Sequence, residues 1–226
     1  MPTPNASDLS GSAAFQGLLS VGLMVLPAHT AAVRHLTADQ LGVQQAEAEA
    51  LARRLRALAR QRSEISEAEL AKLAHLAGLT PTDINDIMHR ALTHGLALIE
   101  AFPELTSMDD HAKNMLIFDA MRRDEAFMNA LKRATTDGVA ADDQASACKN
   151  ACLLTFMMKL FAAQIAAVQR MMACAVLVFP PLVLACAAVM LIIMIVAMTK
   201  ANKEYTQCIE DCLEGNGGGD GGGGGD

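Results

Sequence analysis

Apolar residues recur at helical spacing through most of this chain, and the pattern becomes a nearly continuous apolar run toward the C-terminal end. Between residues 38 and 62 the apolar positions return every three or four residues, as on one face of an amphipathic helix. Ala, Leu and Met dominate, whereas aromatic residues are scarce, with one Tyr and no Trp. This combination favours helix over strand. The sequence therefore predicts an all-α protein.

Capping residues mark where several helices are expected to begin. Thr37 is a typical N-cap for the helix over 38–62, and Ser66 with Glu69 forms a capping-box pattern. Thr80-Pro81 places a proline at the first helical position. The other expected helices span 13–26, 67–77, 81–101, 107–118 and 120–134.

Composition divides the chain into four parts. The first twelve residues are expected to be disordered, the following apolar helix is expected to end near Pro27, and a polar stretch around Gly138 is the best boundary. The Gly/Asp-rich end has no side chains that build a core. The expected parts are a flexible and apolar N-terminal segment (1–35), a soluble helical bundle (36–140), a hydrophobic helical hairpin (145–214) and a disordered tail (215–226).

The six cysteines are placed symmetrically about Pro180-Pro181. Facing residues of two antiparallel helices have residue numbers with a constant sum, and three cysteine pairs share the sum that is centred on Pro180. Two CxxxC pairs of equal spacing share a sum automatically, so the independent observations are the centre on the prolines and the third pair. The pattern predicts a long antiparallel hairpin with an apolar tip at the prolines, joined by the disulfides Cys148–Cys212, Cys152–Cys208 and Cys174–Cys186.

Helical geometry agrees with this pairing. Cys148 and Cys152 are four residues apart and share a helix face, and small alanines flank the pairs, so that the two helices can approach to disulfide distance. Three alternatives remain open. The four cysteines of the two CxxxC pairs form a donor set for zinc in a reducing compartment. The thiols are free and buried, or the same pairs join two chains.

The expected hairpin is about as long as a bilayer is thick. Lys159 and Lys200 each lie about 20 residues from the tip, or roughly 30 Å of helix. Both lysines would reach an interface, while the uncharged tip would cross the hydrocarbon. The cysteine-rich base would remain in water, on a side oxidising enough to keep disulfides. The expected membrane tip consists of Leu177, Val178, Phe179, Pro180, Pro181, Leu182 and Val183.

One charge does not fit a fully inserted hairpin. Arg170 would lie about 15 Å from the tip, where a charge is costly unless it faces water or a polar partner. Three interpretations would accommodate Arg170. The hairpin inserts only part way, or several copies enclose a polar interior. Alternatively, the hairpin is a buried core and not a membrane element. The interface or pore-lining candidates are Lys159, Gln164, Gln169, Arg170 and Lys200.

Net charge and the absence of known motifs limit the classes of partner and activity that the sequence suggests. The formal net charge of −7 argues against nucleic acid as the main partner. Five arginines between residues 53 and 62 are either a solvated helix face or a surface for anionic lipid. No catalytic motif, metal spacing or cofactor motif stands out, so we expect no enzyme activity, no metal and no cofactor. The apolar segment 9–33 lacks the basic start of a convincing signal peptide.

Three resemblances are limited in extent. The twin CxxxC arrangement resembles the small translocase chaperones of the mitochondrial intermembrane space and the plant α-hairpinin peptides, although Cys152 and Cys208 lie much farther apart here. The apolar hairpin joined to a helical body resembles, in architecture, α-helical pore-forming toxins and secretion-system translocators. The segment 73–84 resembles a bacterial helix-turn-helix, but Asp83 and Asp86 would face phosphates.

The sequence thus predicts a non-enzymatic, membrane-inserting protein, pore-forming or toxin-like, secreted or facing an oxidising compartment. Its expected partners are a lipid membrane and further copies of the chain in a homo-oligomer. The first alternative is a membrane-anchored helical adaptor whose bundle recruits a protein partner. The others are a secreted, bacteriocin-like peptide precursor with 1–143 as its leader, and a helix-turn-helix DNA-binding regulator.

Overall fold

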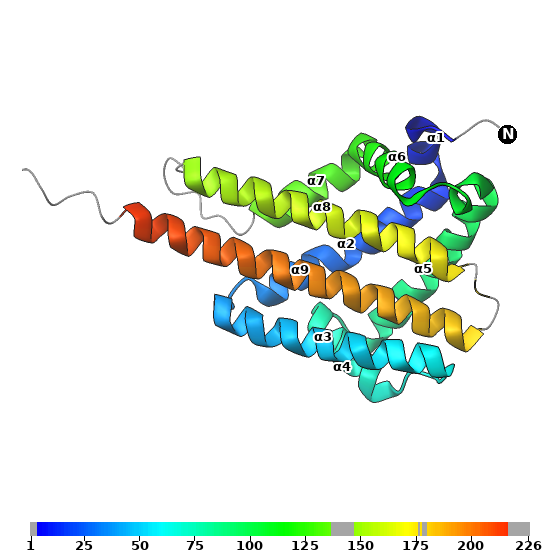
Figure 1. The fold of residues 1–226 in the computed structure, drawn as a ribbon, viewed down its shortest axis with the longest axis horizontal. Coiled ribbons are helices and arrows are strands. Elements are labelled where there is room, and N and C mark those ends of the chain that lie inside the picture. The colour runs from blue at the N-terminus through cyan, green and yellow to red at the C-terminus, as the bar shows by residue number, and fades with distance from the viewer. Residues whose placement is uncertain (1–3, 137–146, 176, 178–179, 217–226) are drawn as a thin grey trace, which may run out of the picture.

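The computed structural model describes residues 4–136, 147–175, 177 and 180–216, and within them it is helical with no strand (Figure 1). This confirms the all-α class. The expected hairpin is formed by the last two helices. The elements are α1 (Ala6–Gly11), α2 (Ala13–Val33), α3 (Ala38–Gln61), α4 (Glu67–Ala77), α5 (Pro81–Ala101), the 3-10 helix η1 (Pro103–Thr106), α6 (Asp110–Arg123), α7 (Glu125–Thr136), α8 (Ala147–Ala175) and α9 (Pro180–Asn216).

The two arms of the hairpin, α8 and α9, lie side by side and antiparallel along the long axis of the molecule (Figure 1). Helix α3 packs along the other side of α9, so that α9 is flanked by α8 and α3. Helices α2 and α5 pack behind this layer, α2 against both arms and α5 mainly against α8. The longest helix, which also contains the most apolar stretch, therefore has neighbours along much of its length.

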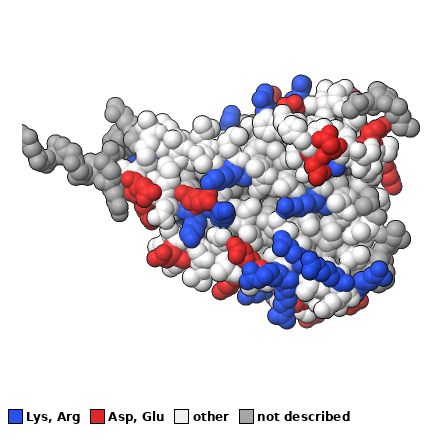
Figure 2. All heavy atoms as spheres, in the orientation of Figure 1, with Lys and Arg blue, Asp and Glu red and all other residues white. Residues whose placement is uncertain are grey.

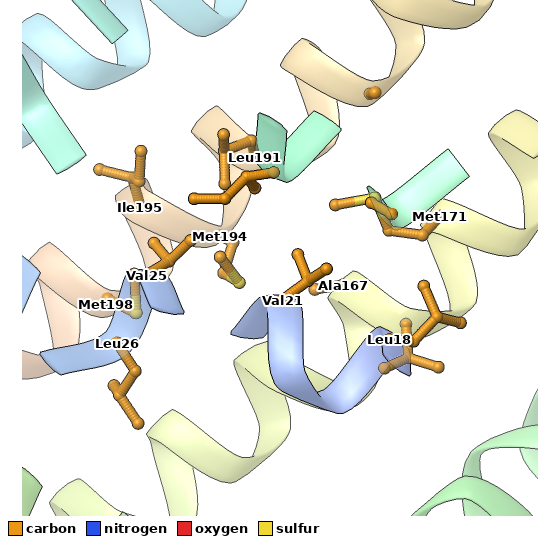
Figure 3. Close-up of a cluster of buried hydrophobic side chains, with 14 of the residues drawn as sticks. Leu18, Val21, Val25, Leu26, Ala167, Met171, Leu191, Met194, Ile195 and Met198 are labelled. Carbon is orange, nitrogen blue, oxygen red and sulfur yellow. The ribbon is translucent and has the colours of Figure 1, made fainter. Parts of the chain in front are cut away.

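Helix α2 supplies part of the surface on which the inner face of the hairpin packs (Figure 3). Its buried leucines and valines meet buried methionine, leucine, isoleucine and alanine side chains of α8 and α9. Each such side chain contributes roughly 1.5–3 kcal/mol when it leaves water. The hairpin and the preceding helices therefore share one apolar core, while their division into separate domains stays a prediction. The residues labelled in this cluster are Leu18, Val21, Val25, Leu26, Ala167, Met171, Leu191, Met194, Ile195 and Met198.

The N-terminal segment differs from its prediction. Residues 6–11 form α1, whose N-cap Asn5 accepts hydrogen bonds from two backbone amides and whose Leu9 is fully buried. Helix α2 does not end near Pro27 but continues to Val33. A proline inside a helix costs about 3 kcal/mol. We attribute the continuation to burial of the turn that follows, where His29 and Val33 are in the core while Pro27 itself is exposed.

Most predicted helix starts are confirmed, and a second boundary is wrong besides the one near Pro27. The predicted caps Thr37, Ser66 and Thr80 each form a full capping box. The break expected between 118 and 120 lies instead at Asp124, whose extended backbone ends α6 and whose carboxylate accepts a hydrogen bond from the Phe127 amide. The expected linker and most of the Gly/Asp tail lie outside the described residues.

Candidate functional site

The hairpin carries the three disulfides that the symmetric cysteine pattern predicts. Their Cα–Cα distances are 5.9 Å for Cys148–Cys212, 5.8 Å for Cys152–Cys208 and 5.6 Å for Cys174–Cys186. These are within the range that a disulfide needs and closer than ordinary helix packing. The arms are therefore fixed in register at the base and near the tip.

Two of these disulfides are adjacent at the base. The Sγ atoms of Cys152 and Cys212, which belong to different bonds, are 3.6 Å apart, and the Sγ atoms of Cys148, Cys152 and Cys212 all lie within 4.8 Å of one another. Thiolates must be free to bind zinc. In this oxidised state all three are engaged in disulfides, so the zinc alternative applies only to a reduced chain.

Within the part of the chain that the structure describes, three helices are long and apolar enough to span a membrane by length and composition. They are α2, α8 and the part of α9 from Leu182 to Leu213, whose most apolar window has a mean hydropathy of 2.9. The stretch from Pro180 to Thr199 contains no Asp, Glu, Lys or Arg. At 1.5 Å per residue these twenty residues measure about 30 Å, which matches hydrocarbon thickness.

The tip predicted for the hairpin is described only in part. Helix α9 begins at Pro180. Leu177, Leu182 and Val183 are half-buried. Val178 and Phe179 lie outside the described residues, as do the side chains of Pro180 and Pro181.

The two lysines expected at one level are joined through a single carboxylate. Lys159 of α8 forms an ion pair with Glu204 of α9, and Lys200 lies 4.0 Å from the other oxygen of the same carboxylate. All three side chains are substantially exposed, so the pairs contribute little to stability. They form a charged band across both arms, and the uncharged part of α9 lies between this band and the tip.

The other polar candidates do not share one surface. Gln164 is 2 % exposed, and its side chain abuts Gly22 of α2, where a Cβ atom would collide with it. Gln169 is half-buried and lines a cavity of about 210 Å³ between α5, η1, α6 and α8. Arg170 is exposed. Neither glutamine Nε2 has a hydrogen-bond partner, which costs roughly 1–3 kcal/mol for a buried donor.

A buried histidine ties the hairpin to the rest of the chain. The Nδ1 atom of His29 is 3.0 Å from the Leu76 carbonyl oxygen of α4, and its Nε2 atom is 3.1 Å from the Thr199 hydroxyl of α9. The carbonyl only accepts, so Nδ1 donates to it. The single proton of the Thr199 hydroxyl has two acceptors within reach, His29 Nε2 and the Ile195 carbonyl oxygen at 2.9 Å. Burial lowers the pKa of His29 to about 4, against a smaller opposing effect of the Leu76 carbonyl.

Sequence reasoning missed this contact. The available indication was that His29 is a titratable residue in the otherwise uncharged segment 9–33. Its partner Thr199 lies 170 residues away, and nothing in the local pattern of α9 distinguishes it from the other residues of a long apolar helix.

The segment that resembles a helix-turn-helix forms the corner between α4 and α5. Gly78 ends α4 with φ +70°, and a Cβ there would lie 2.7 Å from the Ala28 carbonyl oxygen of α2. Glycine is needed for this close approach. The corner therefore packs against α2, and Asp83 and Asp86 lie in the first two turns of α5.

No family model, curated protein or solved structure matches this chain.

Proposed function

We propose that this protein inserts the hairpin α8–α9 into a lipid membrane, without catalysing a reaction, and that the described structure is its closed form. The observation that carries the proposal is the uncharged, bilayer-long stretch of α9, held in a disulfide-linked hairpin and covered by helices of the same chain. Membrane association would replace those helices by lipid.

The hairpin is covalently suited to leave the bundle as one unit. All three disulfides connect α8 with α9, and none connects either arm to an earlier helix. In the sequence, the hairpin follows all other helices and joins them only through residues 137–146. Separation therefore breaks no covalent bond, and the arms remain in register while they move.

Helix α3, which covers α9 in the closed form, is amphipathic enough to remain at a membrane surface after α9 has left it. It is amphipathic: Leu41, Ala48, Leu51 and Leu55 are buried, while its arginines are exposed. Such a helix is compatible with the surface of a membrane after the hairpin has left. The hairpin itself has no comparable polar face between Pro180 and Thr199.

The contact between hairpin and bundle also contains polar groups that a pure apolar core would lack. Gln164 is buried without a partner for its Nε2, whereas Thr199 bonds both to His29 across the contact and to the Ile195 carbonyl oxygen within α9. An unsatisfied buried donor destabilises the closed form by roughly 1–3 kcal/mol. The unpaired Gln164 donor therefore lowers the free energy needed to separate the hairpin from the bundle.

The chain contains no Trp, so a single introduced Trp reports insertion directly. Leu182→Trp places the reporter at a half-buried position in the first turn of α9, within the predicted membrane tip. With liposomes that contain brominated lipids, we expect a blue-shifted emission and strong quenching. The matched control is Ala151→Trp, on the exposed side of α8 between the cysteines of the base, and we expect it to remain unquenched.

Two further readouts separate the alternatives. Release of a trapped dye together with quenching of Leu182→Trp would support a pore. Quenching without release would support an anchored adaptor that inserts without forming a pore. If Leu182→Trp remains unquenched on vesicles that have bound the protein to saturation, insertion of the hairpin is refuted.

A further inference from the structure

Helix α3 presents a row of arginines on one face. Arg53, Arg56 and Arg60 follow the spacing i, i+3 and i+7, which places them on one side of a helix, and all three are exposed. Arg54 points elsewhere and pairs with Glu69 of α4 at 2.8 Å. Among the described residues, no carboxylate forms an ion pair with Arg53, Arg56 or Arg60.

Acidic residues are absent from this part of the helix. Between Glu49 and Glu64 the chain has five arginines and no acid. Glu49 is one turn before Arg53, and its carboxylate accepts a hydrogen bond from the Gln45 amide at 2.9 Å. The row is therefore a local cationic surface on a protein whose formal net charge is −7. Figure 2 shows Lys and Arg gathered over α3 on this face.

The register between α3 and α9 places the row beside the uncharged half of the hairpin. Near the start of α3, a Cβ at Gly42 would lie 3.3 Å from Lys203 Nζ. Farther along, Arg53 and Arg56, together with Glu49 and Ala52, line a groove with Ile193 and Val196 of α9. The two helices run antiparallel (Figure 1), so Arg60 lies near the level of Cys186, toward the tip.

The groove itself combines cationic and apolar walls. It has a volume of about 290 Å³ and is lined by Glu49, Ala52, Arg53 and Arg56 of α3 and by the half-buried Ile193 and Val196 of α9. The two guanidinium groups outnumber the one carboxylate, which already accepts a hydrogen bond from the Gln45 side chain. A phosphate attached to an acyl chain has the complementary chemistry, because its anion meets guanidinium groups and its hydrocarbon meets α9. Guanidinium binds phosphate oxygens with two parallel hydrogen bonds.

We propose that Arg53, Arg56 and Arg60 bind the headgroups of anionic phospholipids and orient the uncharged half of α9 toward the membrane before the hairpin inserts. This inference rests on the proposed function and names the class of lipid that it requires. The position of the row supports a membrane over a nucleic acid: it adjoins an apolar helix, spans about 10 Å, and α3 has no aromatic residue for base stacking.

The test is the partitioning of the full chain to vesicles of phosphatidylcholine with and without phosphatidylglycerol, at low ionic strength. We expect at least ten-fold stronger binding to the anionic vesicles. The variant R53Q/R56Q/R60Q removes three surface cations that are each worth about five-fold, so we expect it to lose on the order of 100-fold on anionic vesicles and little on neutral ones.

The matched control is R34Q/R90Q/R123Q, which removes the same charge from exposed positions outside the row and is expected to bind nearly as the parent does. Far-UV circular dichroism checks that both variants are folded. Equal binding of parent to neutral and anionic vesicles, or equal losses in the two triple variants, would overturn the inference. Tighter binding of the parent chain to duplex DNA than to anionic vesicles would also overturn the inference.

The two proposals fail in different ways. If R53Q/R56Q/R60Q binds anionic vesicles like the parent and the reporter Leu182→Trp is still quenched, the lipid-binding row is wrong and hairpin insertion stands. If binding depends on the row but the reporter at Leu182 is never quenched, insertion is wrong and the cationic lipid surface stands.

Discussion

The ring of His29 and the hydroxyl of Thr199 are hydrogen-bonded at 3.1 Å inside the core, and this contact joins the N-terminal helix α2 to the hairpin arm α9. The same ring contacts the end of α4 through the Leu76 carbonyl. Three elements far apart in sequence thus meet at one neutral imidazole, and burial of that ring disfavours its protonated form and lowers its pKa.

Acid is therefore expected to destabilise the closed form through His29. Its folded pKa of about 4 lies below the unfolded value of 6.5, so the unfolded chain takes up the proton first. Stability from this group is complete above about pH 6.5 and is lost as the pH falls toward 4, by about 3 kcal/mol in all. Urea unfolding at several pH values measures this loss.

The variant His29→Gln should remove this pH dependence, because glutamine does not titrate in this range. The exposed His35→Gln is the control and should retain the parent slope. If the parent and His29→Gln lose the same stability between pH 6.5 and 4, the histidine is not responsible.

The two disulfides at the base are expected to act redundantly. Cys148–Cys212 and Cys152–Cys208 close nested loops with sequence separations of 64 and 56 residues. When one bond is removed, the other still restricts the unfolded chain, so each double Cys→Ala variant should lose little. Removal of both should cost about 2–5 kcal/mol, more than the two separate losses together.

Equilibrium unfolding of C148A/C212A, C152A/C208A and the quadruple variant tests this redundancy. The parent chain, unfolded in the same series with all bonds formed, is the reference. Two equal and additive losses would contradict it.

Replacing the unpartnered amide in the core is expected to stabilise the closed form. Gln164→Met keeps an unbranched side chain of similar length and removes the unsatisfied Nε2 that lies between α8 and α2. We expect a gain of about 1–3 kcal/mol and, under the proposed function, slower quenching of the reporter at Leu182. Thermal and urea unfolding measure the gain.

The control for this change is Gln207→Met, at an exposed position of α9, where no buried donor is relieved and no gain is expected. A loss of stability in Gln164→Met would mean that the amide has a partner in solution.

The local features of this fold were predictable because neighbouring residues determine them. Thr37, Ser66 and Thr80 each cap a helix through atoms within three residues. The errors arise where distant packing decides. Pro27 does not end α2, since the following turn is buried, and α1 forms where Leu9 reaches the core.

The candidate site was predictable only in part. The disulfide pairs, and the placement of Lys159 and Lys200 at the same distance from the tip, could be predicted because facing residues of two antiparallel helices have residue numbers with a constant sum. Whether a side chain on those helices faces protein or water does not follow from that geometry. Gln164 and Arg170 belong to the same arm, yet the former is buried against α2 and the latter is exposed.

The helical class, most helix starts and the cysteine pairing of the hairpin follow from the amino-acid order alone, since they depend on local capping and on one-dimensional register. What covers the hairpin follows only from the packed fold: α2 on its inner face, α3 along α9, and His29 on Thr199. Apolar burial is not directional. An uncharged helix is therefore equally compatible, by sequence, with lipid and with a protein core, and the shapes and polar contacts of its neighbours decide between them.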